Sequence, residues 1–349
     1  MTSFHTLLLL ALLPGAALAE RIHLVAGGSQ DATGIAATEA LLKEPFGMQF
    51  DPGGHMWIIE MVSGNRLLQV DGGGVMTHMA GVGTSGYSGD GGPALRAQFN
   101  GPHNLAIQPD GKILIADTWN GHIRVMDPKA GTVKTLEGWQ APKGKERGNG
   151  HYCITLDFTG NHLYIADLRQ VHHLDLTTGK SEVVAGNGQK GVPEDGAVAI
   201  NAPLVDPRAV AVDRQGNIYI LERNGNALRV VDKSGHIRTV VNASGKKGGE
   251  GDGGPALAAT MNGPKHLCID LDDSVIIADA ESHLIRHYIP ATGKIERLAG
   301  TGIKGSAGVG GDPLKCQLSR PHGVTVHPQT GELYITDSYN NRLLKIVKE

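Results

Sequence analysis

The chain repeats one unit six times, and this repetition constrains its fold more than any other feature. Each copy has two short apolar runs joined by a tight turn, the second run closed by an acid, and then a polar turn and a third apolar run. Residues 102–118, "PHNLAIQPDGKILIADT", and residues 321–338, "PHGVTVHPQTGELYITDS", show the pattern at two distant places. The acids recur every 50 to 58 residues, at Glu60, Asp117, Asp167, Glu222, Asp279 and Asp337.

The apolar runs read as β-strands, because they are short and alternate around Val, Ile, Leu and Tyr. The joints "PDG", "RQG" and "PGG" are typical of tight hairpin turns. A fourth strand such as "SEVVAG" or "IERLAG" follows, and then a glycine-rich bridge, which explains where the 50 glycines gather. Four strands in each of six consecutive units predict an all-β, six-bladed β-propeller, since radial repetition protects the strand edges.

The two ends of the chain predict how the ring closes. The last copy stops at its third strand, "RLLKIVKE", whereas residues 21–28, "RIHLVAGG", read as a fourth strand. We therefore expect the N-terminal strand to pair into the last blade, so that residues 20–349 form a single propeller domain.

Two of the copies identify the type of repeat. Residues 207–232, "PRAVAVDRQGNIYILERNGNALRVVD", and residues 321–347, "PHGVTVHPQTGELYITDSYNNRLLKIV", resemble NHL repeats. The resemblance covers essentially the whole chain after its leader and implies a six-bladed propeller of four-stranded blades. It leaves function open, because this fold carries lyases, hydrolases, sensor domains and scaffolds.

Residues 1–19 predict a signal peptide. Their apolar run ends in an Ala-Leu-Ala cleavage motif, and it is short and interrupted by Pro14, which disfavours the alternative of a membrane anchor. We expect an exported protein, periplasmic or secreted, with no membrane span, and a monomer. The net charge of −3 and the scarcity of aromatic residues disfavour nucleic acid as a partner. The sparse, odd set of Cys153, Cys268 and Cys316 predicts no disulfide.

The inner strands of such a propeller begin at the mouth of the central channel, and the residues there are chemically uneven. One residue per copy falls at this position, namely Phe46, His103, Tyr152, Arg208, Lys265 and His322. We predict a site for a small polar, anionic or carbohydrate-derived ligand, a glycan or a protein, and the candidate contact residues are Tyr152, Arg208, Arg223, Lys265 and Trp119. The alternative for the cations is pairing with the blade carboxylates Glu222 and Asp279.

The histidines of the channel mouth raise the possibility of a metal. His103, His266 and His322, with His151 as a substitute, are candidate ligands of a divalent ion, Zn²⁺ or Ca²⁺. The alternative is that each imidazole binds a loop carbonyl and that the protein has no cofactor.

The "PHN" and "PHG" motifs resemble those of the peptidyl-hydroxyglycine amidating lyase, a propeller whose zinc histidines stand in Pro-His contexts. His103 and His322 match two of its three positions, and Arg208 occupies the third. The resemblance makes Tyr339, in "DSYNN", a candidate for proton transfer, and Arg208 is the other catalytic candidate.

Two functions therefore remain open from the sequence. One is a binding protein, with or without catalytic activity, and the alternative is a metal-dependent lyase or hydrolase that uses the histidines. The blade acids are expected to accept backbone hydrogen bonds. Glu60 and Glu222 have a longer reach that could bring a carboxylate toward the channel.

Overall fold

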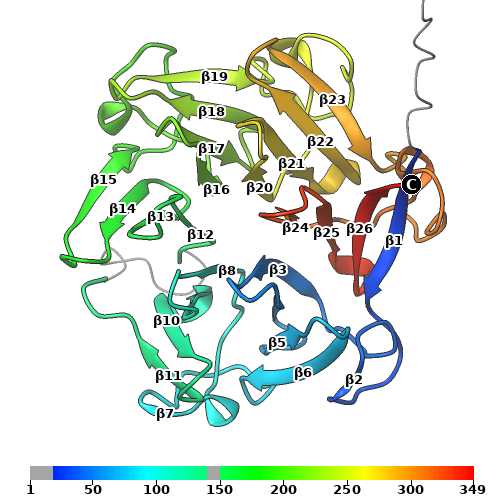
Figure 1. Cartoon of the computed structure of the whole chain (residues 1–349). Helices are drawn as coiled ribbons and strands as arrows, with labels where there is room; N and C mark the ends of the chain where they lie inside the picture. Colours follow the sequence, from blue (N-terminus) through cyan, green and yellow to red (C-terminus); the bar gives the residue numbers. More distant parts are fainter. Residues whose placement is uncertain (1–18, 140–149) are drawn as a thin grey trace, which may run out of the picture.

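A computed structural model describes residues 19–139 and 150–349, so the predicted signal peptide lies almost entirely outside the described residues. Six β-sheets stand around a common centre like the blades of a fan (Figure 1). The innermost strands of blades 1 to 6 are β3 (Pro45–Phe50), β8 (Asn104–Ile107), β12 (Cys153–Leu156), β16 (Pro207–Val212), β20 (His266–Ile269) and β24 (Gly323–Val326). The all-β six-bladed propeller is confirmed.

Each blade continues outward from its inner strand through antiparallel neighbours. Blade 1 adds β4 (Met56–Glu60), β5 (Leu67–Val70), β6 (Val75–Ala80) and β2 (Ile35–Ala36). Blade 2 adds β9 (Ile113–Asp117), β10 (His122–Asp127), β11 (Thr132–Thr135) and β7 (Gly92–Pro93). Blades 3 and 4 add β13 (His162–Ala166), β14 (Val171–Asp175) and β15 (Ser181–Ala185), and β17 (Ile218–Glu222), β18 (Ala227–Val231) and β19 (Ile237–Val241). Blade 5 adds β21 (Val275–Asp279), β22 (Leu284–Ile289) and β23 (Lys294–Ala299).

Blade 6 closes the ring with both ends of the chain. It adds β25 (Leu333–Asp337), β26 (Arg342–Lys348) and, outermost, β1 (Glu20–Ala26). β1 pairs antiparallel with β26, with Ile22 opposite Ile346, and the two strands lie side by side in Figure 1. The predicted closure by the N-terminal strand is confirmed.

Short 3₁₀ helices are the other regular elements in the described parts of the chain, and they lie in the connections: η1 (Ala94–Arg96), η2 (Thr118–Asn120), η3 (Ala199–Asn201), η4 (Ala256–Ala258), η5 (Ala280–Ser282), η6 (Pro313–Lys315) and η7 (Ser338–Asn340). No helix within residues 19–139 and 150–349 is long and apolar enough to cross a membrane. All three cysteines are free, as predicted.

The acids that close the second strand of each blade are anchors for the segment that leads to the channel. In five blades the carboxylate accepts the backbone N–H of a residue that lies three positions before the channel-mouth residue, at 2.6 to 2.8 Å. These donors are Lys43, Asn100, Val205, Asn262 and Ser319. In blade 3, where the corresponding position lies outside the described residues, Asp167 accepts from the backbone N–H groups of Arg169 and Gln170.

Each anchoring acid also faces a basic side chain on the third strand of its own blade, or directly before that strand in blade 1, at 2.7 to 3.5 Å. The six partners are Arg66, Arg124, His172, Arg229, Arg286 and Arg342. The prediction that the acids accept backbone hydrogen bonds is therefore correct. The expectation that Glu60 and Glu222 reach toward the channel is wrong, because both carboxylates are fully buried between these arginines and the backbone.

We expect Arg286→Met to destabilise the propeller strongly. Arg286 is fully buried and pairs with Asp279 and Asp252, so its loss leaves a buried carboxylate without its cation. Breaking such a pair costs about 3–5 kcal/mol, which urea denaturation would measure. Arg297→Met, at an exposed position of the same blade, is the matched control and should change the free energy of unfolding by less than about 0.5 kcal/mol. Equal stability of the two variants would contradict a structural role for the pair.

Candidate ligand site at the centre of the propeller

The channel-mouth residues predicted from the repeat register do meet at the centre. Phe46 stacks on His322 with ring centroids 4.0 Å apart and meets His103 edge-on at 5.2 Å. The His103 ring is 4.7 Å from that of Tyr152, and the Arg208 guanidinium lies 3.7 Å from the centre of the Tyr152 ring. A continuous series of contacts therefore runs through blades 6, 1, 2, 3 and 4, and we call these five residues with Lys265 the hub ring.

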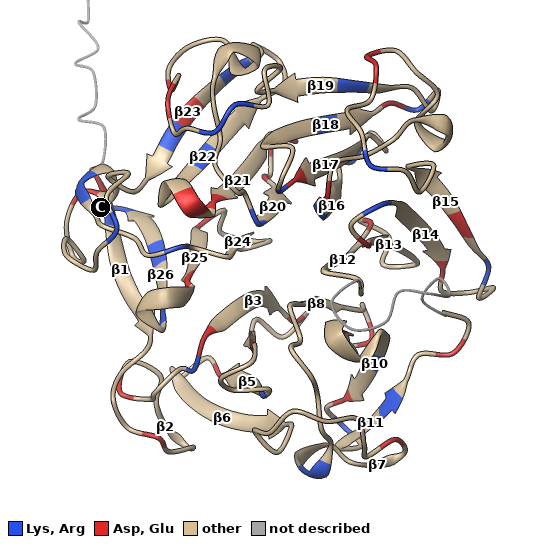
Figure 2. Ribbon diagram, turned by 180° about the vertical axis from the view of Figure 1, so that it is seen from behind, with Lys and Arg blue, Asp and Glu red and all other residues tan. Residues whose placement is uncertain are grey.

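Cationic side chains crowd one side of the hub ring. Lys265, which is 9% exposed, lies 3.7 Å from the carboxylate of Glu281. Arg320 binds the same Glu281 oxygen directly, so one acid serves two cations. Charged positions mark the ribbon near the ring centre where β16 and β20 begin (Figure 2).

Arg208 and Arg223 complete this cluster of four cations. Both lower the pKa of Lys265, and Arg223 also lowers that of Glu281, so the charges act on one another. The second described carboxylate that acts on the cluster is Asp206, whose charge, after the effect of Tyr152, opposes the lowering of the Arg208 pKa by burial. Asp206 also accepts a hydrogen bond from Asn224 at 2.6 Å. Among the described residues, four cations thus face two carboxylates.

Burial and mutual repulsion change the charge state of this cluster. Desolvation, followed by the charges of Arg208 and Arg223, lowers the pKa of Lys265 to about 7. Desolvation also lowers the pKa of Arg208 to about 10, so Arg208 remains charged at neutral pH. The predicted alternative, pairing of these cations with Glu222 and Asp279, is wrong, because Arg229 and Arg286 occupy those carboxylates.

The two Pro-His histidines are neutral. Burial first, and then the charges of Arg208 and Lys265, hold the pKa of both His103 and His322 well below 6.5. Nδ1 of His103 lies 2.7 Å from the carbonyl oxygen of Gly101 and therefore carries the ring proton, which leaves Nε2 as an acceptor. Nδ1 of His322 is buried and has no hydrogen-bond partner among the described residues.

The other two candidate metal ligands lie in different surroundings. Nε2 of His266 is 3.1 Å from the Asn104 amide nitrogen, and Nε2 of His151 is 2.7 Å from the carbonyl oxygen of His122. Burial lowers the pKa of each to about 4. His103 and His322 therefore remain as candidate ligands, and the four cations beside them disfavour a divalent ion there. Metal at the hub stays a prediction that these surroundings do not favour.

The Asn104–His266 contact belongs to a second set of contacts next to the hub ring. It joins blade 2 to blade 5 across the centre, one residue further along the inner strands, and the Asn104 side-chain oxygen accepts from the backbone of Ile154 in blade 3. On blade 6, Thr325 donates to the carbonyl of Met48 in blade 1. Side chains next to the hub ring therefore link inner strands of different blades directly to one another.

The two outer aromatic candidates border the hub. Tyr339 accepts a hydrogen bond from Arg320 at 3.0 Å, and its ring is 5.6 Å from that of His322. The Trp119 ring is 6.1 Å from that of His103 and packs over Gly101, where a Cβ atom would lie only 2.6 Å from it. Sequence analysis missed Arg320 and Glu281. The signal for Arg320 was present in "RPHG", where an arginine directly precedes a Pro-His motif.

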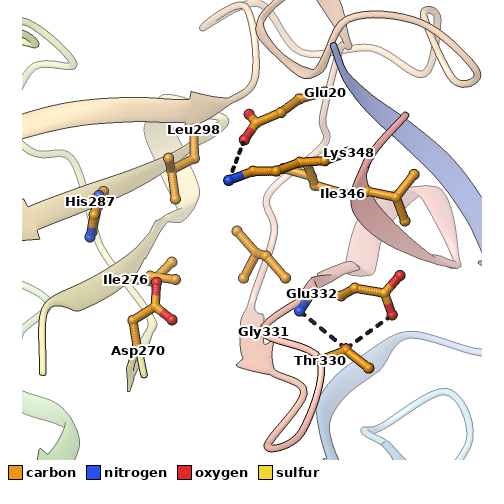
Figure 3. A pocket seen from close by; sticks show the side chains of 12 residues that line it. Glu20, Asp270, Ile276, His287, Leu298, Thr330, Gly331, Glu332, Ile346 and Lys348 are labelled. Atoms are coloured by element: carbon orange, nitrogen blue, oxygen red, sulfur yellow. Dashed lines mark hydrogen bonds and ion pairs between the residues drawn. The ribbon is translucent and has the colours of Figure 1, made fainter. Parts of the chain in front are cut away.

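A hollow of about 600 Å³ lies between blades 5 and 6, at the end of the inner strands opposite to the hub ring (Figure 3). Its charged walls are largely paired within the protein: Lys348 with Glu20 at 4.0 Å, and Glu332 with Lys345 at 3.1 Å. In the described parts of the chain, the one group of three metal-type side chains with ligand atoms within 4.8 Å of one another is Asp270, Asp272 and His287, at this hollow. Ser274 donates its backbone N–H to Asp272, and its hydroxyl group is hydrogen-bonded to His287. Two of these three side chains therefore already have partners within the protein.

Comparison with known proteins confirms the repeat type. The NHL repeat family matches residues 99–126 and 318–346, and the teneurin NHL domain matches residues 145–250. Human Teneurin-1 is 32% identical over 169 residues, which are 44% of this chain and 6% of Teneurin-1. The chloroplastic protein SUPPRESSOR OF QUENCHING 1 of Arabidopsis thaliana is 26% identical over 288 residues, covering 76% of this chain and 27% of the plant protein. The chain carries NHL repeats and forms an NHL-type six-bladed propeller.

Solved structures share this fold at low identity. An auxiliary nutrient binding protein of Bacteroides thetaiotaomicron aligns with a TM-score of 0.69 at 15% identity, over 95% of this chain and 77% of that one. Virginiamycin B lyase of Staphylococcus aureus aligns with a TM-score of 0.55 at 14% identity, over 95% of this chain and all of that one. These likenesses support the architecture and leave the ligand to be argued from the site itself.

We expect the pKa values of His103 and His322 to lie well below the value of about 6.5 of an ordinary imidazole, so that neither ring shows a titration midpoint near that pH. Their burial beside Arg208 and Lys265 opposes a further positive charge. The ring carbon shifts in NMR spectra, assigned with His103→Gln and His322→Gln variants, measure this directly. A midpoint near 6.5 for either residue would contradict the neutral state.

Proposed function

We propose that this propeller binds a small carboxylate, such as a sugar acid, at the hub ring. The observation that carries the proposal is the excess of positive charge: Arg208, Arg223, Lys265 and Arg320 act on one another with two carboxylates between them. Guanidinium groups bind planar carboxylates with two parallel hydrogen bonds, which makes them suited to such a ligand.

The uncharged part of the hub fits the rest of such a molecule. Phe46, Tyr152, Trp119 and Tyr339 supply aromatic surface at and beside the hub ring. Nε2 of His103 is an acceptor for a hydroxyl group, because Nδ1 donates to the Gly101 carbonyl. A ligand with a carboxylate and hydroxyl groups therefore finds a complementary group for each part.

The comparisons support a binding role and an exported location as parts of this proposal. Proteins named auxiliary nutrient binding proteins, from Bacteroides thetaiotaomicron and Bacteroides ovatus, share the fold. The leader of residues 1–19 predicts export, which is where a protein that captures an external solute would act. The metal-dependent lyase or hydrolase predicted as an alternative gains less support, because the cations surround the histidines that it would need.

Isothermal titration with D-galacturonate, D-gluconate and pyruvate, and with neutral D-galactose as the uncharged comparison, tests the proposal. We expect at least one carboxylate to bind and the neutral sugar to bind at least tenfold more weakly. Arg208→Met and Arg320→Met should each weaken binding about tenfold or more, since a charge-assisted hydrogen bond contributes about 1.5–3 kcal/mol.

Arg96→Met, at an exposed outer position, is the matched control and should bind like the unchanged protein. Thermal unfolding of each variant separates lost binding from lost folding. Equal binding by Arg208→Met and Arg96→Met, or no preference for carboxylates over the neutral sugar, would overturn the proposal.

A further inference from the structure

Lys265 is placed unlike a lysine that serves only to bind an anion. Its side chain is buried at the hub, and its amine lies 3.7 Å from Glu281, the carboxylate that Arg320 holds more closely. Within the described residues no hydrogen bond to the amine accompanies this contact, whereas the Lys265 backbone is fixed by a 3.0 Å bond to Ala278. Glu281 therefore only weakly neutralises the amine, and the backbone from which the Lys265 side chain extends is held in place.

The neighbours of Lys265 favour its uncharged form. The charged and titratable groups that face it come from blades 2, 4, 5 and 6 and are Arg208, Arg223, Glu281, Arg320, His103 and His322. Burial is the main cause that lowers the pKa of the amine to about 7, and repulsion adds to it, because three of the four permanently charged groups are cations. A lysine that is desolvated beside other cations is an activated nucleophile toward carbonyl compounds.

We propose that Lys265 forms an imine with an aldehyde or ketone group carried by the small carboxylate that the surrounding arginines bind. The inference rests on the proposed function and adds a covalent step to it. Sugar acids in their open-chain form and 2-oxo acids both carry a carboxylate and a carbonyl group. The site thus selects one chemical class, a carbonyl-bearing carboxylate.

The step balances without an oxidant, reductant or metal. The Lys265 nitrogen attacks the carbonyl carbon, and the carbonyl oxygen becomes a hydroxyl group by gaining a proton that the nitrogen loses. The hydroxyl then leaves as water with the second amine proton, and the C=N bond forms.

Reductive trapping tests this step. The protein is incubated with pyruvate and sodium cyanoborohydride, which reduces an imine to a stable amine, and the adduct is located by peptide mass spectrometry. We expect one adduct, at Lys265, formed at pH 7 at least tenfold faster than at any exposed lysine. An ordinary lysine has fewer than about one amine in 1,000 uncharged at that pH.

Two variants and one compound make the test specific. Lys265→Met should lose the adduct, and Lys294→Met, at an exposed position of the same blade, should keep it. Acetone, which has the carbonyl without the carboxylate, should label Lys265 at least tenfold more slowly than pyruvate. The labelling rate should rise with pH and level off above about pH 7, whereas ordinary lysines with a pKa of about 10.4 continue to gain reactivity.

The outcomes separate the two proposals. Carboxylate binding in titration without trapping at Lys265 would overturn the imine and leave the binding function standing. Equal labelling by acetone and pyruvate, or an adduct that survives in Lys265→Met, would also overturn the imine proposal. Absence of both binding and trapping would overturn both.

Discussion

In five blades, a hydrogen bond between a buried acid and one backbone N–H holds the blade to the segment that enters the centre. This N–H belongs to the residue three positions before the hub ring, as in the pairs Glu222 with Val205 and Asp337 with Ser319. The three positions between the anchored residue and the hub residue are too short a segment for the hub residue to move independently of the anchor. The acid therefore fixes where the hub side chain begins, and the site depends on this repeated structural contact.

The arginine or histidine that faces each anchoring acid pairs with that acid, so the acid is not the partner of the cations at the hub. Arg229 and Arg286 occupy Glu222 and Asp279, so these carboxylates do not neutralise the cations at the centre. The fold thus separates two sets of charges that lie close in the sequence. One set is paired inside the blades, and the other remains in excess at the channel mouth.

This excess sets the chemistry of the hub. Burial first, and then nearby positive charge, disfavours a further proton, so the pKa values of His103, His322 and Lys265 are all lowered. The anion binding and the activated lysine that we propose would both depend on this cationic cluster.

The repeat register predicted which residues form the hub ring, because every unit begins its inner strand at the same place. Phe46, His103 and Arg208 meet as expected even though they belong to three different blades. The pair formed by Glu281 and Arg320 could not be predicted in the same way, because the two residues come from different blades and lie 39 residues apart in the sequence. The contact of His266 with Asn104 of the opposite blade could not be predicted either, because the two residues are far apart in the sequence.

By itself the sequence determined the fold, the closure by β1 and the membership of the hub ring, since alternating strands, turn residues and a regular period are local properties that sum to a closed ring. Only the tertiary structure decided which charges are paired and which side chains are neutral. Pairing and pKa depend on burial and on the distances between groups from different blades, and the order of residues along the chain does not contain these quantities.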